Sequence, residues 1–259
     1  QIQKVVEDVK ILLGGAVPRS TLDGLMVKVN CTSFLAVDVP GEGRKVLITP
    51  FGDLGDGSFL DPVGNQRLFI DHGKQVCTGA EALSGSEYRD SSGLRDDVDS
   101  AMNRYAANKL PNSVVTTYYK DVGGKSTITC CIGRCDLNLS NYWAGLWRSH
   151  WVLECSGSSS GQLKGTVHSN VHYFEDGNVQ LDDSTTFSCE LSGSNLAEAM
   201  AKKVEEYEME FNKGMEETYA TMSETVLQGL RRRLPVTRVK FDWDNKASVH
   251  KLASELQRK

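Results

Sequence analysis

The chain has 259 residues, of which 39% are hydrophobic, and a formal net charge of −5 at pH 7. It is long enough to bury a sizeable core, as one large domain or two small ones. It contains no run of about 18 apolar residues, which excludes a membrane-spanning helix. Its seven cysteines form no paired framework, which favours reduced thiols in the cytosol or nucleus.

The first 40 residues are expected to be a helical segment. Apolar side chains recur at helical spacing through residues 1–13, and Gly14, Gly15 and Pro18 end that helix. A second short apolar segment runs from about Leu22 to Phe34.

Residues 41–112 are expected to form a turn-rich middle region that contains one helix. Short β-like pieces lie at Val46–Thr49 and Arg67–Asp71, and residues 78–95 are rich in Gly and Ser, which predicts a loop. A helix is predicted from about Leu94 to Leu110, because Pro111 cannot continue it.

Residues 113–192 are expected to form an antiparallel sheet. Short connections join five consecutive candidate strands, and such connections favour a meander in which sequential strands pair. The predicted strands are Val114–Lys120, Ser126–Asp136, Trp143–Cys155, Gln162–Phe174 and Asn178–Glu190.

Residues 194–230 are expected to form one long helix. Asn195 and Glu198 resemble a capping box, and apolar residues then recur with a bias towards i+4 for about 35 residues, or roughly 50 Å. A five-stranded sheet is only about 24 Å wide. One way to cover the excess apolar face is a second sheet from another subunit, so the helix length indicates a dimer.

Residues 231–259 are expected to form an interaction tail. The last 32 residues carry nine basic and three acidic side chains, a net charge of +6, whereas the rest of the chain carries −11. Val249, Leu252, Ala253 and Leu256 form one apolar stripe at helical spacing. Such a short amphipathic helix either packs on its own domain or binds a groove on a partner, and spacing alone leaves both readings open.

No motif predicts catalysis, so no enzyme activity, cofactor or metal site is expected. The segment from Gly157 to Gly161 matches G-x-S-x-G but joins two predicted strands, whereas the nucleophile motif needs a strand-to-helix turn. The cluster of Cys130, Cys131 and Cys135 lacks the second pair that zinc requires. Trp143, Trp147 and Trp151 share one face of a strand, which is more simply the face under the long helix than a nucleic-acid platform.

Four long segments resemble the α subunit of the F-actin capping protein heterodimer. They are Val46–Pro62, Asn141–Trp151, Val171–Leu181 and Tyr219–Trp243. The resemblance implies an α+β fold: an N-terminal helical bundle, a central five-stranded antiparallel sheet, a long C-terminal helix over the sheet, and a short amphipathic tail called the tentacle. The family begins about one helix before Gln1, so the bundle is expected to be incomplete.

The resemblance also implies a function and partners. The chain would pair with a capping protein β subunit about a pseudo-two-fold axis, bind the barbed end of actin filaments, and block both addition and loss of subunits. The alternative is a capping subunit of an actin-related filament within dynactin. Phosphoinositides and ankyrin-repeat or CPI-motif proteins would be regulators, no nucleic acid is expected, and the location would be the cytoplasmic actin cytoskeleton.

The family's actin-binding residues carry over to the tail. Basic contacts would come from Arg231, Arg232, Arg238 and Lys240, and an apolar anchor from Val249, Leu252 and Leu256. The family typically has a lysine where this chain has Gln228 and a glutamine where it has Arg233. The total charge is therefore kept while its position shifts.

Overall fold

The computed structural model describes residues 7–9, 11, 12, 14, 19–84, 88–122, 125–155, 159–174 and 179–222. The chain divides into two compact units, residues 1–208 and 209–259. The first unit contains every described strand, and the described part of the second, residues 209–222, is helical. The predicted tail lies outside the described residues.

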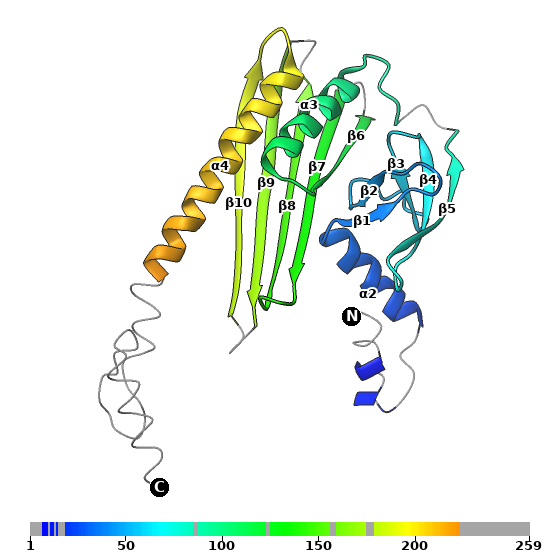
Figure 1. Ribbon diagram of the computed structural model, residues 1–259. Coiled ribbons are helices and arrows are strands. Elements are labelled where there is room, and N and C mark those ends of the chain that lie inside the picture. Colours follow the sequence, from blue (N-terminus) through cyan, green and yellow to red (C-terminus); the bar gives the residue numbers. More distant parts are fainter. Residues whose placement is uncertain are drawn as a thin grey trace. The chain divides into compact units, whose positions relative to one another are not determined.

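Residues 19–82 of the first unit form a small module of one helix and five short strands (Figure 1). The strands form a two-stranded sheet, β1–β2, and a three-stranded sheet, β3–β4–β5. The elements are α2 (Arg19–Thr32), β1 (Leu35–Asp38), β2 (Lys45–Ile48), β3 (Ser58–Asp61), β4 (Gln66–Asp71) and β5 (Val76–Ala82).

Two of these strands coincide with predicted β pieces, and three were not predicted. Strands β1 and β3 have four residues each, so the alternation that identifies a strand has little length in which to appear. Strand β5 has seven residues, but its sequence VCTGAEA contains a glycine and two alanines, which are depleted in strands. The predicted loop at residues 78–95 is wrong at its start, because residues 78–82 belong to β5.

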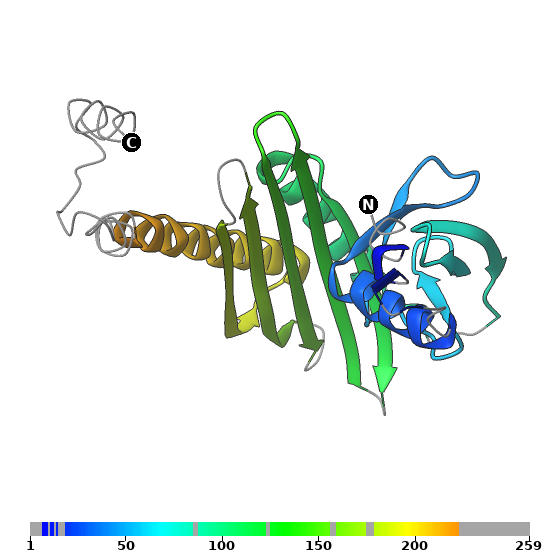
Figure 2. The same cartoon turned by 90° about the horizontal axis from the view of Figure 1, so that it is seen from below.

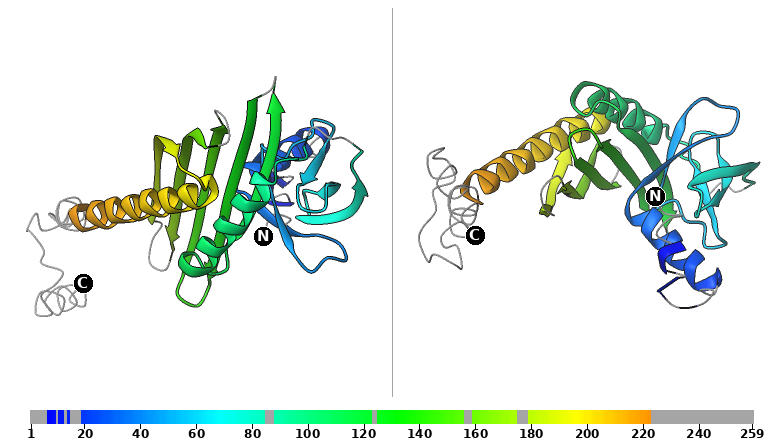
Figure 3. Two further views of the ribbon diagram at one scale, coloured as in Figure 1. Left: turned by 90° about the horizontal axis from the view of Figure 1, so that it is seen from above. Right: turned by 60° about the horizontal axis from the view of Figure 1, so that its bottom comes forward.

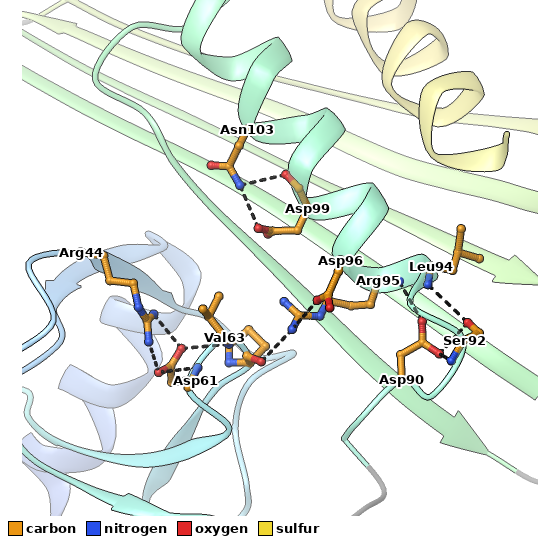
Figure 4. Close-up of polar contacts among 12 residues, drawn as sticks. Arg44, Asp61, Val63, Asp90, Ser92, Leu94, Arg95, Asp96, Asp99 and Asn103 are labelled. Atoms are coloured by element: carbon orange, nitrogen blue, oxygen red, sulfur yellow. Dashed lines mark hydrogen bonds and ion pairs between the residues drawn. The ribbon is translucent and has the colours of Figure 1, made fainter.

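A buried ion pair holds the turns of this module together (Figure 4). The Arg44 guanidinium donates to both carboxylate oxygens of Asp61, at 2.9 and 2.5 Å, and the Asp61 side chain is fully buried. The same carboxylate accepts from the backbone N–H groups of Val63 and Gly64. Because all its lone pairs have donors, the buried charge is compensated.

The centre of the unit is a five-stranded antiparallel sheet in the order β10-β9-β8-β7-β6. This confirms the predicted meander, and each predicted strand overlaps an observed one. The strands are β6 (Val114–Val122), β7 (Lys125–Asn138), β8 (Trp143–Cys155), β9 (Ser160–Tyr173) and β10 (Val179–Ser192). Tyr142 reverses the chain before β8 with a φ of 54°.

Helix α3 (Leu94–Lys109) and the first half of α4 (Leu196–Met222) lie on one face of this sheet (Figure 2). The start of α3 is held by Asp90, which accepts from the backbone N–H groups of Ser92 and Arg95 (Figure 4). Arg95 also donates to the carbonyl of Pro62 at 3.0 Å. The helix is thereby fastened to the small module as well as to the sheet.

Helix α4 begins as the sequence predicts. The Asn195 side chain accepts from the backbone N–H of Glu198 at 3.1 Å, which is an N-cap. Leu196, Met200 and Val204 are buried at a spacing of four residues. This apolar stripe faces the sheet.

The small module packs against the opposite face, over β6 and β7 (Figure 3). The Tyr118 hydroxyl donates to the Leu47 carbonyl at 2.8 Å, and the Leu47 N–H donates to Thr116 Oγ1 at 2.9 Å. Leu47, Leu60, Tyr118 and Cys131 form a shared buried cluster. Both faces of β6 and β7 are therefore covered.

Candidate interaction surfaces

The sequence-predicted actin-binding residues all lie in the tail, outside the described residues. They are Arg231, Arg232, Arg238, Lys240, Val249, Leu252 and Leu256. The described part of the chain offers other surfaces, and the sheet carries two of them.

The helix-covered face of the sheet is buried at one end and partly exposed at the other. Ser149, Trp151 and Leu153 on β8 are fully buried beneath the helices. Because side chains alternate along a strand, Trp143 and Trp147 lie on the same face, and the structure leaves both partly exposed. The predicted common face for the three tryptophans is confirmed, but in the described residues only Trp151 is fully buried.

The neighbouring strands extend this exposed area with more apolar side chains. Tyr173 pairs with Trp143 across β8 and β9, and Leu181 pairs with Val171 across β9 and β10. Val171 is 38% exposed and Tyr173, the last residue of β9, is 41% exposed. We call this area the open patch, and its residues are Trp143, Trp147, Val171, Tyr173 and Leu181.

Strand β10 lies beside the open patch at the edge of the sheet (Figure 1). Among the described residues it pairs with β9 alone, in one continuous register from Val179 to Ser192. An edge strand of 14 residues presents a row of backbone N–H and C=O groups that can pair with another chain. The edge and the open patch together form a surface that can take a second sheet and a helix.

The other face of β8, β9 and β10 is polar and borders a small groove. As predicted, Arg148 and His150 point to the side opposite the tryptophans; they line a groove of about 290 Å³ beside Phe51. His168 Nε2 lies 2.6 Å from the Asp182 carboxylate, and this hydrogen bond lowers the pKa of Asp182. Of the basic side chains that line the groove, His168 contacts a carboxylate directly, whereas Arg148 donates to the Thr32 carbonyl and lies against His168.

The described residues contain no group of three or more His, Cys, Asp or Glu side chains that could hold a metal ion. Cys130 and Cys131 are buried in the sheet, and burial raises the pKa of both thiols. Such thiols are poor nucleophiles at neutral pH. None of the described helices is long and apolar enough to cross a membrane.

Comparison with known proteins gives a match along nearly the whole chain. The family model described as "F-actin capping protein alpha subunit" matches residues 1–255. This chain belongs to that family. The match includes the tail, which the described residues do not reach.

Individual capping protein α subunits agree with this assignment. The F-actin-capping protein subunit alpha of Dictyostelium discoideum is 32% identical over 262 residues, covering all of this chain and 92% of the relative. The protein of the same name from Caenorhabditis elegans is 31% identical over 242 residues, covering 90% of this chain and 83% of the relative. Both alignments cover well over two thirds of this chain and of the relative.

A solved structure shares the fold. The homodimeric actin capping protein alpha subunit from Plasmodium berghei superimposes with a TM-score of 0.75, covering 90% of each chain at 17% sequence identity. At this identity the likeness concerns the fold alone.

Sequence reasoning on this capping protein α chain missed the open patch. It assigned the whole tryptophan face to the chain's own long helix. Strand alternation does place Val171, Tyr173 and Leu181 on the same face as the tryptophans. It does not tell which residues of that face the helices cover.

Proposed function

We propose that this chain is the α subunit of a heterodimeric capping protein that binds the barbed end of actin filaments and blocks addition and loss of subunits. The family match over residues 1–255 carries the proposal, because it spans the sheet, the long helix and the tail. The relatives at 31–32% identity bear the name F-actin-capping protein subunit alpha. The proposed location is the actin cytoskeleton of the cytoplasm.

The proposed partner is a capping protein β subunit, and two features of the sheet support this. Among the described residues β10 pairs with β9 alone, so its other edge suits a strand of a second sheet. The open patch beside it is apolar, which suits the long helix of the partner. Burying Val171 and Tyr173 under that helix would remove apolar surface that is exposed in the single chain.

The proposed filament-binding segment is the tail from residue 231 to 259. Arg231, Arg232, Arg238 and Lys240 would approach acidic actin surface and steer the encounter. Val249, Leu252 and Leu256 would then lie in an apolar groove on a terminal actin subunit. Anionic phosphoinositides and ankyrin-repeat proteins would compete for the basic residues, and CPI-motif proteins are proposed as further regulators.

Tail deletion tests the filament-binding role. The chain is co-expressed with a β-type capping subunit, either whole or ending at Arg232, and each complex is added to seeded pyrene-actin elongation at the barbed end. The whole complex should stop elongation at substoichiometric concentrations, and the shortened complex should assemble but cap far more weakly. Equal inhibition by both would refute the role of the tail. Binding to a short actin-related filament without any effect on actin elongation would favour the dynactin alternative.

A charge placed in the open patch tests the partner surface. Tyr173→Glu should prevent assembly with the β-type subunit, as measured by size-exclusion chromatography with light scattering, because the partner helix would have to bury the carboxylate. Thr186→Glu adds the same charge on the exposed opposite face of β10 and should leave assembly intact. Assembly of the Tyr173→Glu chain would refute the proposed surface. A homodimer formed without any β-type subunit would replace the proposed partner with a second copy.

A further inference from the structure

A carboxylate is buried at the centre of the contact between α4 and the sheet. Glu208 on α4 is 1% exposed. Its Oε1 accepts from Ser149 Oγ at 2.6 Å and from Trp151 Nε1 at 3.1 Å, and its Oε2 accepts from the Tyr105 hydroxyl at 2.7 Å. Strand β8 and helix α3 thus supply three donors to one side chain of α4.

The surroundings of this carboxylate are otherwise apolar. Met200 and Val204 precede it along the buried stripe of α4, and Trp151 stacks against Tyr207 with ring centroids 5.9 Å apart. Burial raises the pKa of Glu208, and the three donated hydrogen bonds offset only part of that rise. Desolvating a carboxylate is costly, so an apolar residue would fill this position more simply.

The aliphatic stripe of α4 selects one position along the sheet only weakly, unlike the ring stack of Tyr207 on Trp151. Leu196, Met200 and Val204 repeat at a spacing of four residues, with small Ala197 and Ala201 between them. A shift of one helical turn, about 5.4 Å, would put one apolar side chain roughly where the previous one lay. Contacts between such similar side chains change little in that shift.

The polar contact does select one position. The same shift would withdraw Glu208 from all three donors and leave a buried carboxylate, a hydroxyl on each of two elements, and an indole N–H without partners. Buried polar groups are best documented in this role, where they fix register at a cost in stability.

We propose that Glu208 is a positioning residue that sets the register of α4 on the sheet through Tyr105, Ser149 and Trp151. The proposed filament-binding tail follows α4 in the sequence, so we expect a change in the register of α4 to weaken the hold on the filament. This inference rests on the proposed function, because its functional readout is barbed-end capping.

Two variants separate positioning from simple stability in the complex with the β-type subunit. Glu208→Gln keeps a carbonyl acceptor for Ser149 and Trp151, and its amide can donate to the Tyr105 hydroxyl. The triple variant Tyr105→Phe, Ser149→Ala, Glu208→Leu replaces the polar contact with apolar groups and leaves only the indole N–H unpaired. Replacing both sides of a buried hydrogen bond in this way can be nearly neutral for stability. Glu206→Leu, at an exposed position on the same helix, is the control.

The expected result is a split between stability and capping. The triple variant should assemble and unfold at a temperature close to that of the unmodified complex, while its dissociation rate constant from barbed ends rises about tenfold. Glu208→Gln should stay within about twofold of the unmodified complex, and Glu206→Leu should not change the rate. Tyr105→Phe alone should raise the rate but add nothing once Glu208 is leucine, because the two side chains form one interaction.

Unchanged dissociation of the assembled triple variant would overturn the proposal. So would a Glu208→Gln complex that is as defective as the triple variant, because the polar contact would then not explain the effect. If the triple variant does not fold, the single variants Tyr105→Phe and Glu208→Gln test the proposal instead. Equal dissociation rate constants for both variants and the unmodified complex would overturn it. Failure of the proposed function is a distinct result, since the unmodified complex would then not slow elongation.

Discussion

The indole of Trp151 packs directly on the backbone of Gly165, its partner across strands β8 and β9. A β-carbon at residue 165 would lie 2.6 Å from Cδ2 and Cζ3 of that ring and closer still to Cε3. Trp151 is fully buried and also contacts Glu208 and Tyr207 on α4. The glycine therefore makes room for the residue on which the long helix rests.

Gly165→Ala should destabilise the chain, because the ring cannot retreat from a methyl group without displacing α4. Overpacking of this kind costs about 1–3 kcal/mol. For a chain of this length, each kcal/mol lowers the melting temperature by roughly 2–4 °C. Differential scanning calorimetry of the complex with the β-type subunit measures this.

Gly24→Ala is the matched control. Gly24 lies within α2, and a β-carbon there would meet nothing within 4 Å. Replacing a helical glycine with alanine should stabilise by about 0.5–1 kcal/mol. If the Gly165→Ala complex melted at or above the melting temperature of the unmodified complex, the contact between Trp151 and Gly165 would not be rigid.

Tyr118→Phe should loosen the small module from the sheet. The Tyr118 hydroxyl donates to the Leu47 carbonyl at 2.8 Å and accepts from Thr49 Oγ1 at 3.2 Å, in a fully buried setting. Removing it leaves both groups without that partner, which costs about 1–3 kcal/mol. Urea unfolding and limited proteolysis between residues 19 and 84 measure the effect. The exposed Tyr142→Phe change should have none, and equal effects of the two variants would contradict this account.

The sequence predicted the sheet well because its strands are long. Trp143–Cys155 was predicted with the observed bounds. Asn195 was likewise identified as a cap, and the structure shows its hydrogen bond to the Glu198 N–H. Long periodic elements and helix caps can therefore be recognised from the local sequence.

Features that depend on tertiary contacts were not predicted from the sequence. The pattern of α4 places Glu208 on the apolar stripe, four residues after Val204, but only the structure shows that its carboxylate meets three donors. Strands β1 and β3 were missed for another reason, since four residues are too few to show a periodic pattern. The actin-binding residues of the tail stay a prediction, since they lie outside the described residues.

Two histidines should make the stability fall as the pH is lowered below about 6.5. Burial lowers the pKa of His72 from its ordinary value of 6.5, although the carboxylates of Asp71, Asp23 and Asp53 counteract part of this. Asn30 Nδ2 donates to His72 Nδ1 at 3.1 Å, so a second ring proton on Nδ1 would break that bond. Burial also lowers the pKa of His150.

The sign follows from proton binding. Between the folded pKa and 6.5 the unfolded chain binds more protons than the folded one, so the free energy of unfolding rises with pH and is lost as pH falls. Denaturation at pH 7.5, 6.5 and 5.5 should show this decline, and His72→Gln with His150→Gln should flatten it. Burial raises the pKa of Glu208, and this residue contributes equally to the pH dependence of the unmodified chain and of the double variant. An unchanged slope in the double variant would show that other groups cause the decline.

The two parts of the tail should affect different rate constants of capping. Arg231→Ala, Arg232→Ala and Arg238→Ala together should slow association with barbed ends by about tenfold at low salt and weaken its dependence on ionic strength, because steering acts before contact. Val249→Ser, Leu252→Ser and Leu256→Ser should leave association nearly unchanged and speed dissociation, because the apolar contacts form only after docking.

Three lysines outside the tail provide the control for net charge. Lys28, Lys120 and Lys202 are exposed and lie outside the tail, and replacing all three with alanine changes the total charge by the same amount. Single-filament microscopy, which resolves capping and uncapping events separately, yields both rate constants. If the lysine variant slowed association as much as the arginine variant, general charge rather than the tail would steer the complex. If the serine variant dissociated normally, the apolar stripe would have no part in holding the filament end.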